Sequence, residues 1–187
     1  PFIMSDLIKF VKAKCPQLKL KLREETTEQG LQSVERGQLD MLILALPYET
    51  QQFHTRSLAQ DPFLLTLHRD FAIEPFQKDI HFWPDHSLFL LDQEHCLANH
   101  TLKACHIKDK SKINPFYASS LYTIKEMIND KQGVSFLPQL AVSSGFLEGS
   151  ELITVSTMQE TNYLKPILNN EIKFIIILIV LIKTQHL

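Results

Sequence analysis

The amino-acid sequence predicts an α/β fold, because segments with helical periodicity alternate with segments that have strand periodicity. The first fifty residues show the order helix, strand, helix, strand. A continuous apolar run at residues 41–46 (MLILAL) is typical of a buried strand, and similar short runs recur farther along the chain. This alternation favours a largely parallel sheet.

Two helices and two strands are expected in the first fifty residues. Apolar residues at helical spacing predict a first helix that ends before Pro16. Leucines that alternate with basic residues predict a strand over residues 18–23. Thr26, followed three positions later by Gln29, is typical of a capping box, and Gly37 is suited to end the helix that follows. The second strand is the run at residues 41–46.

The later elements follow from the same patterns. Short apolar segments predict strands at residues 63–67, 87–91 and 134–137. Either Ser119 or Ser120 is suited to cap a helix. Its apolar stripe consists of Leu121, Ile124 and Ile128. Gly133 is placed to close this helix, and Pro138 suits the first turn of another.

Composition indicates a soluble globular protein with one domain or two small lobes. The chain has 187 residues, of which 44% are hydrophobic and 21% charged, with a formal net charge of −2. A nucleic-acid-binding domain usually carries a basic surplus or stripe, and neither is evident. Any DNA-binding activity is therefore expected to reside in a segment that this chain lacks.

Cysteine usage and the two ends of the chain indicate a cytoplasmic protein. Three cysteines in 187 residues do not suggest a secreted disulfide scaffold. Residues 1–14 alternate charged and apolar residues at helical spacing, unlike a signal peptide. The apolar run at residues 174–182 (FIIILIVLI) is too short to span a bilayer. It is either a buried strand or the product of a disrupted reading frame.

The most informative window is residues 90–105 (LLDQEHCLANHTLKAC). It opens at the end of an expected strand, and ligands of parallel sheets bind at that edge. Cys96 follows His95 there, and a helix is expected after Cys96. A helix N-terminus and a nearby imidazolium both stabilise a thiolate, which is the nucleophilic form of cysteine. This environment suits attack on a small oxidant.

The spacing of Cys96 and Cys105 suggests a conformational switch. Nine positions of straight helix would separate the two sulfurs by about 13 Å along the axis, and the side chains would project from nearly opposite faces. A disulfide requires Cα atoms within about 7 Å. Forming it would therefore force the intervening segment to unwind.

Other interpretations of these residues remain open. Two cysteines at this spacing are often simply buried apolar side chains. A metal site is a further alternative, although the spacing matches no common zinc pattern. Its candidate ligands are His95, Cys96, His100, Cys105 and His106. Cys15, before Pro16, is most simply a structural thiol, and Thr26 and Thr27 are first of all helix-start residues.

Two stretches resemble a known family. Residues 15–46 (CPQLKLKLREETTEQGLQSVERGQLDMLILAL) resemble the start of LysR-type effector-binding domains in the alternating strand, the threonine pair and the G-x-L-D before an apolar strand. The window LLDQEHCLANHTLKAC, followed by NPFYASSLYTIKEMI and GVSFLPQLAV, resembles the peroxide-sensing OxyR branch of that family. The resemblance covers residues 1–160.

The resemblance implies a role for several residues. Cys96 matches the peroxidatic cysteine, and Cys105 matches the resolving cysteine that closes a disulfide. His95 and Thr27 match residues of the peroxide pocket, and Ser119 and Ser120 are weaker candidates for ligand binding. The implied ligand is hydrogen peroxide. Neither a cofactor nor a metal is implied, and the domain is not expected to be an enzyme.

The family also implies an architecture and partners. Two α/β subdomains surround a cleft, as in periplasmic binding proteins, with residues 1–62 and 161–187 in the first lobe and residues 63–160, including the redox cysteines, in the second. Implied partners are a second copy in a homodimer or homotetramer, DNA through an N-terminal domain, RNA polymerase, and a thiol reductant such as glutaredoxin. No membrane association is implied.

Two departures from the family pattern concern the first lobe. The family has an N-terminal winged helix-turn-helix, a linker helix and a first strand with another pocket threonine, which this sequence does not show. The tail from residue 161 lacks the expected returning strand pattern. The first lobe is therefore expected to be incomplete, and the chain to be a truncated or frame-disrupted copy.

Three functional hypotheses follow. The first is a redox-switched transcription regulator, which responds to peroxide through Cys96 and Cys105. The second is a LysR-type domain that senses a small metabolite in the cleft between its lobes, with the cysteines incidental. The third is a thiol-based enzyme such as a peroxidase, although no C-x-x-C motif accompanies the thiols.

Overall fold

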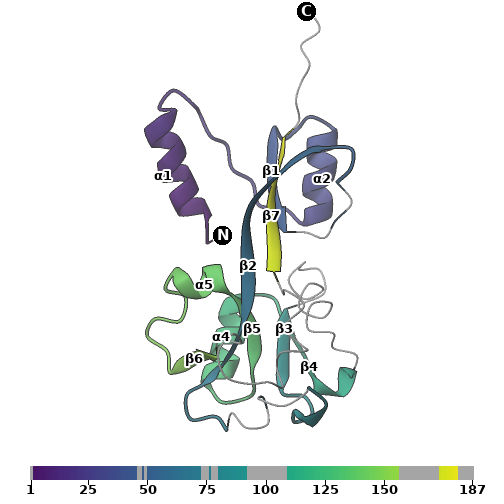
Figure 1. Ribbon diagram of the computed structural model, residues 1–187, viewed down its shortest axis with the longest axis vertical. Helices are drawn as coiled ribbons and strands as arrows, with labels where there is room; N and C mark the ends of the chain where they lie inside the picture. The colour runs from purple at the N-terminus through teal and green to yellow at the C-terminus, as the bar shows by residue number, and fades with distance from the viewer. Residues whose placement is uncertain are drawn as a thin grey trace, which may run out of the picture.

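The computed structural model describes residues 2–45, 48, 50–72, 76, 80–91, 109–155 and 173–180, with the backbone alone at 81 and 173–180. The α/β fold expected from the sequence is confirmed (Figure 1). The helices are α1 (Met4–Lys14), α2 (Thr27–Glu35), α4 (Leu121–Asn129) and α5 (Gln139–Ser143). The strands are β1 (Met41–Ala45), β2 (His54–His68), β3 (Leu88–Leu91), β4 (Ile113–Ala118), β5 (Ser135–Pro138), β6 (Leu152–Val155) and β7 (Lys173–Val180).

The long strand β2 joins two groups of elements. Its residues 54–62 pair with β7, which also pairs with β1, and we call these three segments the β7 unit. Its residues 63–68 pair with β5 and β6, and we call these strands together with α5 the β5 unit. Figure 1 shows β2 running from the upper group, beside β1, β7 and α2, into the lower group of β3, β4, β5 and the helices α4 and α5.

The prediction of a largely parallel sheet is wrong for most of the strand pairs. Every pair in the five-stranded sheet, β1–β7, β7–β2, β2–β5 and β2–β6, is antiparallel. The described parallel contacts are the β3–β4 pair and a bridge between Leu88 and Val134, just before β5. Apolar periodicity identifies strands but carries no information on their direction, which depends on how each connection crosses the sheet.

The strand expected over residues 18–23 is also wrong. These residues form neither a helix nor a strand, and no described strand pairs with them. Leu18 and Leu22 are both 53% exposed. A strand is stable only when a neighbour satisfies its backbone groups and covers one face, and the alternating sequence supplies neither by itself.

The cap of α2 forms as the sequence predicts. The side chain of Thr26 accepts a hydrogen bond from the N–H of Gln29, and the side chain of Gln29 accepts one from the N–H of Thr26. Gly37 follows the helix with a φ of 68°, a left-handed conformation that glycine adopts without strain. Gly30 lies against Leu42 of β1, where its missing side chain allows close packing of α2 on the strand.

The helix α4 ends differently from the prediction for Gly133. The helix stops at Asn129, and Lys131 takes the left-handed conformation, with a φ of 59°. Gly133 serves a different purpose, because a Cβ atom at this position would lie 2.2 Å from the carbonyl oxygen of Ser87. The glycine therefore allows the chain to approach β3, and Val134 exchanges hydrogen bonds with Ser87 and Phe89.

The main core lies in the lower group and is rich in aromatic side chains. Trp83 is 2% exposed, meets the edge of Phe76 at a centroid distance of 5.1 Å and stacks on Phe136 of β5 at 6.0 Å. Fully burying a side chain of this size stabilises the fold by about 2–3 kcal/mol. A second cluster, which includes Phe89 and Leu137, packs β3 and β5 against α4 and α5.

The apolar C-terminal run contains a strand, so the expectation that the tail from residue 161 lacks a strand returning to the first lobe is wrong. Residues 173–180 form β7, which lies between β1 and β2. Ile177 pairs with Leu44 on one side and with Ser57 on the other. Among the residues that the structure describes, no helix is long and apolar enough to cross a membrane.

Candidate functional site

The carboxyl ends of β3 and β4 meet at one edge of the lower group. Leu91, the last residue of β3, pairs with Ala118, the last residue of β4, and the two strands are parallel. The chain therefore leaves both strands at the same edge, after Leu91 toward residues 92–108 and after Ala118 toward Ser119. Edges of this kind are the usual ligand-binding positions of parallel strands.

Ser119 and Ser120 lie at this edge in different environments. Ser120 is half-buried and caps α4, because its Oγ atom accepts a hydrogen bond from the N–H of Thr123 at 3.2 Å. The two hydroxyl groups of Ser120 and Thr123 are 3.1 Å apart. Ser119 is exposed. The N-terminus of α4 thus points its unpaired amide groups and positive dipole end at the edge where β3 and β4 end.

The chain is firmly anchored where β4 begins. Lys112, only 8% exposed, donates a hydrogen bond from Nζ to Oδ1 of Asp85 at 2.6 Å. Ser111 also donates to Asp85, and the side-chain amide of Asn114 donates to the carbonyl of His86 at 2.7 Å. The hydrogen bond and charge of Lys112, with the Ser111 hydroxyl, hold the pKa of the Asp85 carboxyl below its usual range. This contact fixes the chain at Asp109–Asn114 against the turn that precedes β3.

The strand β3 is fixed in a similar way from the other side. Ser135 of β5 is 2% exposed and donates a hydrogen bond from its hydroxyl to the carbonyl of Phe89 at 2.9 Å. All four residues of β3 are buried. Residues 92–108 therefore follow a buried strand and precede the anchored residues Asp109–Asn114.

Thr27 lies in a different part of the molecule from Ser119 and Ser120. It is the first residue of α2, directly after the capping Thr26, and it is half-buried. The helix α2 packs on β1 in the upper group, whereas α4 packs on β2, β3 and β4 in the lower group. Thr27 and Ser120 share one feature: each lies at the N-terminus of a helix.

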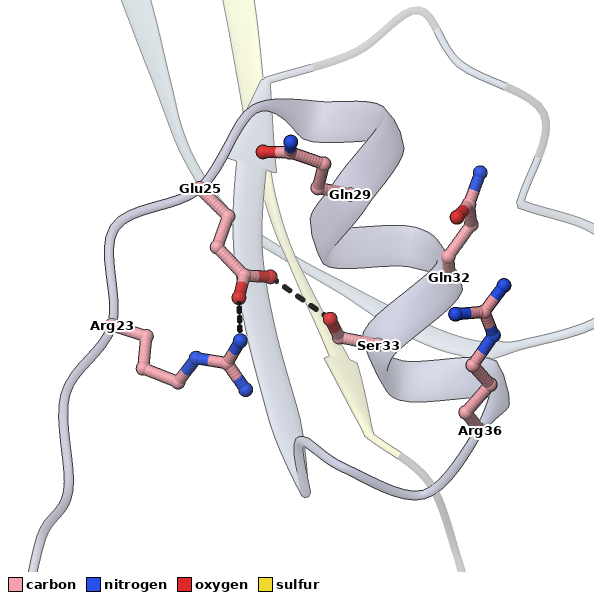
Figure 2. Close-up of a pocket in the computed structure, with 6 residues that line it drawn as sticks. All are labelled: Arg23, Glu25, Gln29, Gln32, Ser33 and Arg36. Carbon is pink, nitrogen blue, oxygen red and sulfur yellow. Dashed lines mark hydrogen bonds and ion pairs between the residues drawn. The ribbon is translucent and has the colours of Figure 1, made fainter.

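A pocket open to solvent lies beside α2 (Figure 2). Its volume is about 280 Å³, and its lining is entirely polar: Arg23, Glu25, Gln29, Gln32, Ser33 and Arg36. Glu25 forms an ion pair with Arg23 and accepts a hydrogen bond from the Ser33 hydroxyl at 3.0 Å. Figure 2 shows these three side chains joined on one side of α2, with Arg36 at the far end of the helix.

The predicted redox residues lie outside the described residues. These are His95, Cys96 and Cys105, together with the alternative metal ligands His100 and His106. Cys15 is described and is an exposed free thiol. Within the described part of the chain, no three His, Cys, Asp or Glu side chains lie close enough together to hold a metal ion.

Sequence patterns did not reveal three features of the structure, two of which are contacts between distant residues. The polar face of α2 repeats at helical spacing, and this signal would identify an exposed helix face without showing the pocket. The contact between Asp85 and Lys112 joins residues 27 positions apart, and that between Asp61 and Leu140 joins residues 79 positions apart. Neither pair has a local signature in the sequence.

Comparisons with known proteins agree on one family. The family model of the LysR substrate binding domain matches residues 1–157. The HTH-type transcriptional regulator EstR of Acinetobacter baylyi is 30% identical over 162 residues, which are 85% of this chain and 53% of that protein. The hydrogen peroxide-inducible genes activator of Haemophilus influenzae is 31% identical over 144 residues, 76% of this chain and 48% of that protein. The chain thus spans about half the length of these curated relatives.

A solved structure gives the same result over almost the whole chain. The reduced form of the regulatory domain of OxyR2 from Vibrio vulnificus is 35% identical, with a TM-score of 0.84, and the match covers 99% of this chain and 83% of that domain. The expected two-lobed α/β architecture is therefore confirmed as that of a LysR substrate-binding domain. The chain belongs to the LysR substrate-binding-domain family, in the branch of the OxyR regulatory domains.

Proposed function

We propose that this chain is the hydrogen-peroxide-sensing regulatory domain of a transcription regulator, switched by a thiol–disulfide change between Cys96 and Cys105. The name of the Haemophilus influenzae relative supports this function. The structural observation that best supports peroxide sensing by Cys96 is the pairing of Leu91 with Ala118, because Cys96 follows Leu91 by only five positions. The segment with the proposed sensor cysteine thus starts at the edge where the N-terminus of α4 supplies a positive field.

The chemistry requires peroxide and the two thiols alone. The Cys96 thiolate attacks one peroxide oxygen, an S–O bond forms, the O–O bond breaks, and the leaving hydroxide takes a proton to become water. Cys105 then attacks the sulfur of the sulfenic acid, forms the disulfide and releases a second water molecule. Peroxide is reduced by two electrons, and the two thiols are oxidised by two. A thiol reductant such as glutaredoxin resets the switch.

The remaining candidate residues have assisting roles in this proposal. His95 stabilises the thiolate, and Thr27 hydrogen-bonds peroxide or its water. Ser119 is exposed and offers its hydroxyl as a further ligand group, whereas Ser120 acts through the cap of α4. Because α2 and α4 belong to different groups of elements, a ligand held by both would lie between the two lobes.

The proposal extends to the whole regulator. We assign residues 1–62 and 161–187 to one lobe and residues 63–160 to the other, supported by the change of partner along β2 after Pro62. DNA is bound by another part of the protein, in a cytoplasmic homodimer or homotetramer that acts on RNA polymerase. The names of the relatives as transcription regulators support the DNA-linked role.

A titration with stoichiometric hydrogen peroxide tests the switch. The reduced protein is treated with increasing peroxide, and its thiols are mapped by mass spectrometry. We expect a Cys96–Cys105 disulfide in the wild type, a trapped sulfenic acid at Cys96 in C105S, and no disulfide in C96S. The exposed Cys15 is the matched control, so C15S should behave as the wild type. Oxidation of Cys15 while Cys96 remains reduced would exclude the mechanism.

A second candidate function is the sensing of a small metabolite. The observation that favours it is the match to EstR, which covers 85% of the chain and thus extends beyond the redox window. On this hypothesis the cysteines have no part in signalling. The full-length regulator carrying C96S would still change its transcriptional output when its inducer is added. Loss of every response in C96S, with the wild type active, would instead favour peroxide sensing.

A further inference from the structure

The strand β2 changes its partners at one position. Residues His54 to Pro62 pair with β7, and Phe63 is the first residue to pair with β5. Figure 1 shows β2 continuing from the upper group into the lower one, with α5 beside the middle of the strand. The relative orientation of the β7 unit and the β5 unit therefore depends on the contacts near this junction.

Asp61 lies at this junction with a buried carboxylate. The residue is 5% exposed, and its Oδ1 atom accepts a hydrogen bond from the N–H of Leu140 at 2.9 Å. The amide of Gln139 also lies near enough to this carboxylate to lower its pKa. These are the first two amide groups of α5, which have no partner within their own helix.

Asp61 therefore does the work of a helix cap for α5. The local N-cap residue is Pro138, whose side chain has no hydrogen-bonding group. Asp61 takes its place although it lies 79 residues before Leu140 in the chain. The carboxylate belongs to the part of β2 that pairs with β7, and the amides belong to the β5 unit. The contact thus links the two units through a charged group.

The other contacts near the junction are of a different kind. Several ion pairs lie within one group, such as Arg23–Glu25 in the upper group and Lys112–Asp85 in the lower group. Contacts that cross between the groups include the packing of Ala45 of β1 against the core cluster that contains Phe63 and Leu65. Apolar contacts tolerate sliding, whereas a hydrogen bond weakens steeply when its angle changes.

We propose that Asp61 is a latch that holds the β7 unit and the β5 unit in one relative orientation. Rotation of one unit against the other about the Pro62–Phe63 junction moves the carboxylate away from the first turn of α5 and leaves both groups buried without a partner. The orientation in the structure is the one in which this cost is avoided. The latch uses none of the residues of the redox proposal and is independent of it.

Residual dipolar couplings of the backbone amides test this inference on the full chain. They report the orientation of each unit directly, independently of overall stability. In the reduced wild-type protein, one alignment tensor should fit the amides of both units. In D61A, each unit should still fit its own tensor, but one shared tensor should no longer fit both. Exchange of the Leu140 amide should become faster by about tenfold or more, as expected for the loss of a hydrogen bond to a charged group.

Two further variants make the result decisive. S120A removes the cap of α4, which lies wholly within the lower group, and should retain one shared tensor. L140P removes the donor from the other side of the latch, in the first turn where proline is tolerated, and should separate the tensors as D61A does. If D61A does not fold, L140P decides. If one shared tensor still fits both units in every folded variant that lacks the contact, Asp61 is only a local cap and the inference is overturned.

Discussion

The Oγ atom of Ser120 accepts a hydrogen bond from the backbone N–H of Thr123 at 3.2 Å, while the neighbouring Ser119 is exposed and takes no part in the cap. Replacing an N-cap serine by alanine costs about 1 kcal/mol of stability, because an amide group at the helix start loses its partner. We therefore expect S120A to lower the free energy of unfolding by about 1 kcal/mol and S119A by less than about 0.5 kcal/mol. Urea denaturation measures both, and equal losses would contradict the assignment of the cap.

Gly133 is required by close approach rather than by backbone conformation. A Cβ atom there would lie 2.2 Å from the Ser87 carbonyl oxygen, and this backbone atom has no room to move while Val134 is bonded to it. We expect G133A to lower the free energy of unfolding by about 2 kcal/mol or more, in the range of overpacked cores. Thermal or urea unfolding provides the measurement.

Gly149 is the matched comparison for Gly133. It has a φ of +73°, and nothing lies within 4 Å of the Cβ position. G149A should therefore cost only the left-handed strain of about 1–2 kcal/mol, with no change in packing. The two substitutions should also differ in their effect on the core. The indole fluorescence of the buried Trp83 should shift in G133A and remain unchanged in G149A. Identical effects of the two substitutions would argue against the close approach at Gly133.

The pH dependence of stability should reveal the contact between Asp85 and Lys112. The hydrogen bond and charge of Lys112 lower the pKa of Asp85 below its ordinary value of 3.8. A lowered pKa in the folded state stabilises the fold above that ordinary value, and this contribution is lost as the pH falls through the folded-state pKa. D85N should therefore be less stable than the wild type at neutral pH and approach it in strong acid. The exposed Asp6 gives the control D6N, which should show a smaller difference.

Asp61 should produce the opposite pH dependence. Burial is the largest influence and raises the pKa of Asp61 above 3.8, although the amides of Leu140 and Gln139 act against it. With a raised folded-state pKa, the stabilising contribution belongs to the protonated form and is lost as the pH rises above 3.8 through the folded-state pKa. The stability of the wild type relative to D61N should thus fall over that interval and then become constant. A difference that does not vary with pH would contradict the raised pKa.

Local interactions were the part of the fold that could be predicted from the sequence. The capping box of Thr26 and Gln29, the left-handed Gly37 and the cap at Ser120 all depend on residues within a few positions of each other. The same holds for the apolar stripe of Ile124 and Ile128, both buried in α4. Interactions between residues a few positions apart can be predicted from the sequence, because both partners lie in the same short segment.

The features that were missed depend on distant partners. The strand at residues 18–23 failed because strand formation requires a neighbour that the local pattern does not identify. The antiparallel sheet was missed because β2 continues through both groups of elements, so that one strand pairs with β7, β5 and β6. For the candidate site, the sequence predicted that Ser119 or Ser120 caps α4, and the structure identifies Ser120. The sequence did not predict the anchor formed by Asp85 and Lys112. That anchor brings together two segments on either side of residues 92–108.

The C-terminal strand should contribute strongly to stability, because β7 lies between β1 and β2. Ile177 pairs with Leu44 of β1 and with Ser57 of β2, so a substitution there affects both ladders. Proline lacks the N–H that a strand donates and is excluded from central strands, and we expect I177P to cost about 3 kcal/mol or more. I177T retains a β-branched residue and an intact backbone, and it should cost less. Amide exchange of residues 41–45 should rise sharply in I177P and little in I177T. Unchanged protection of β1 in I177P would show that the strand pairs elsewhere.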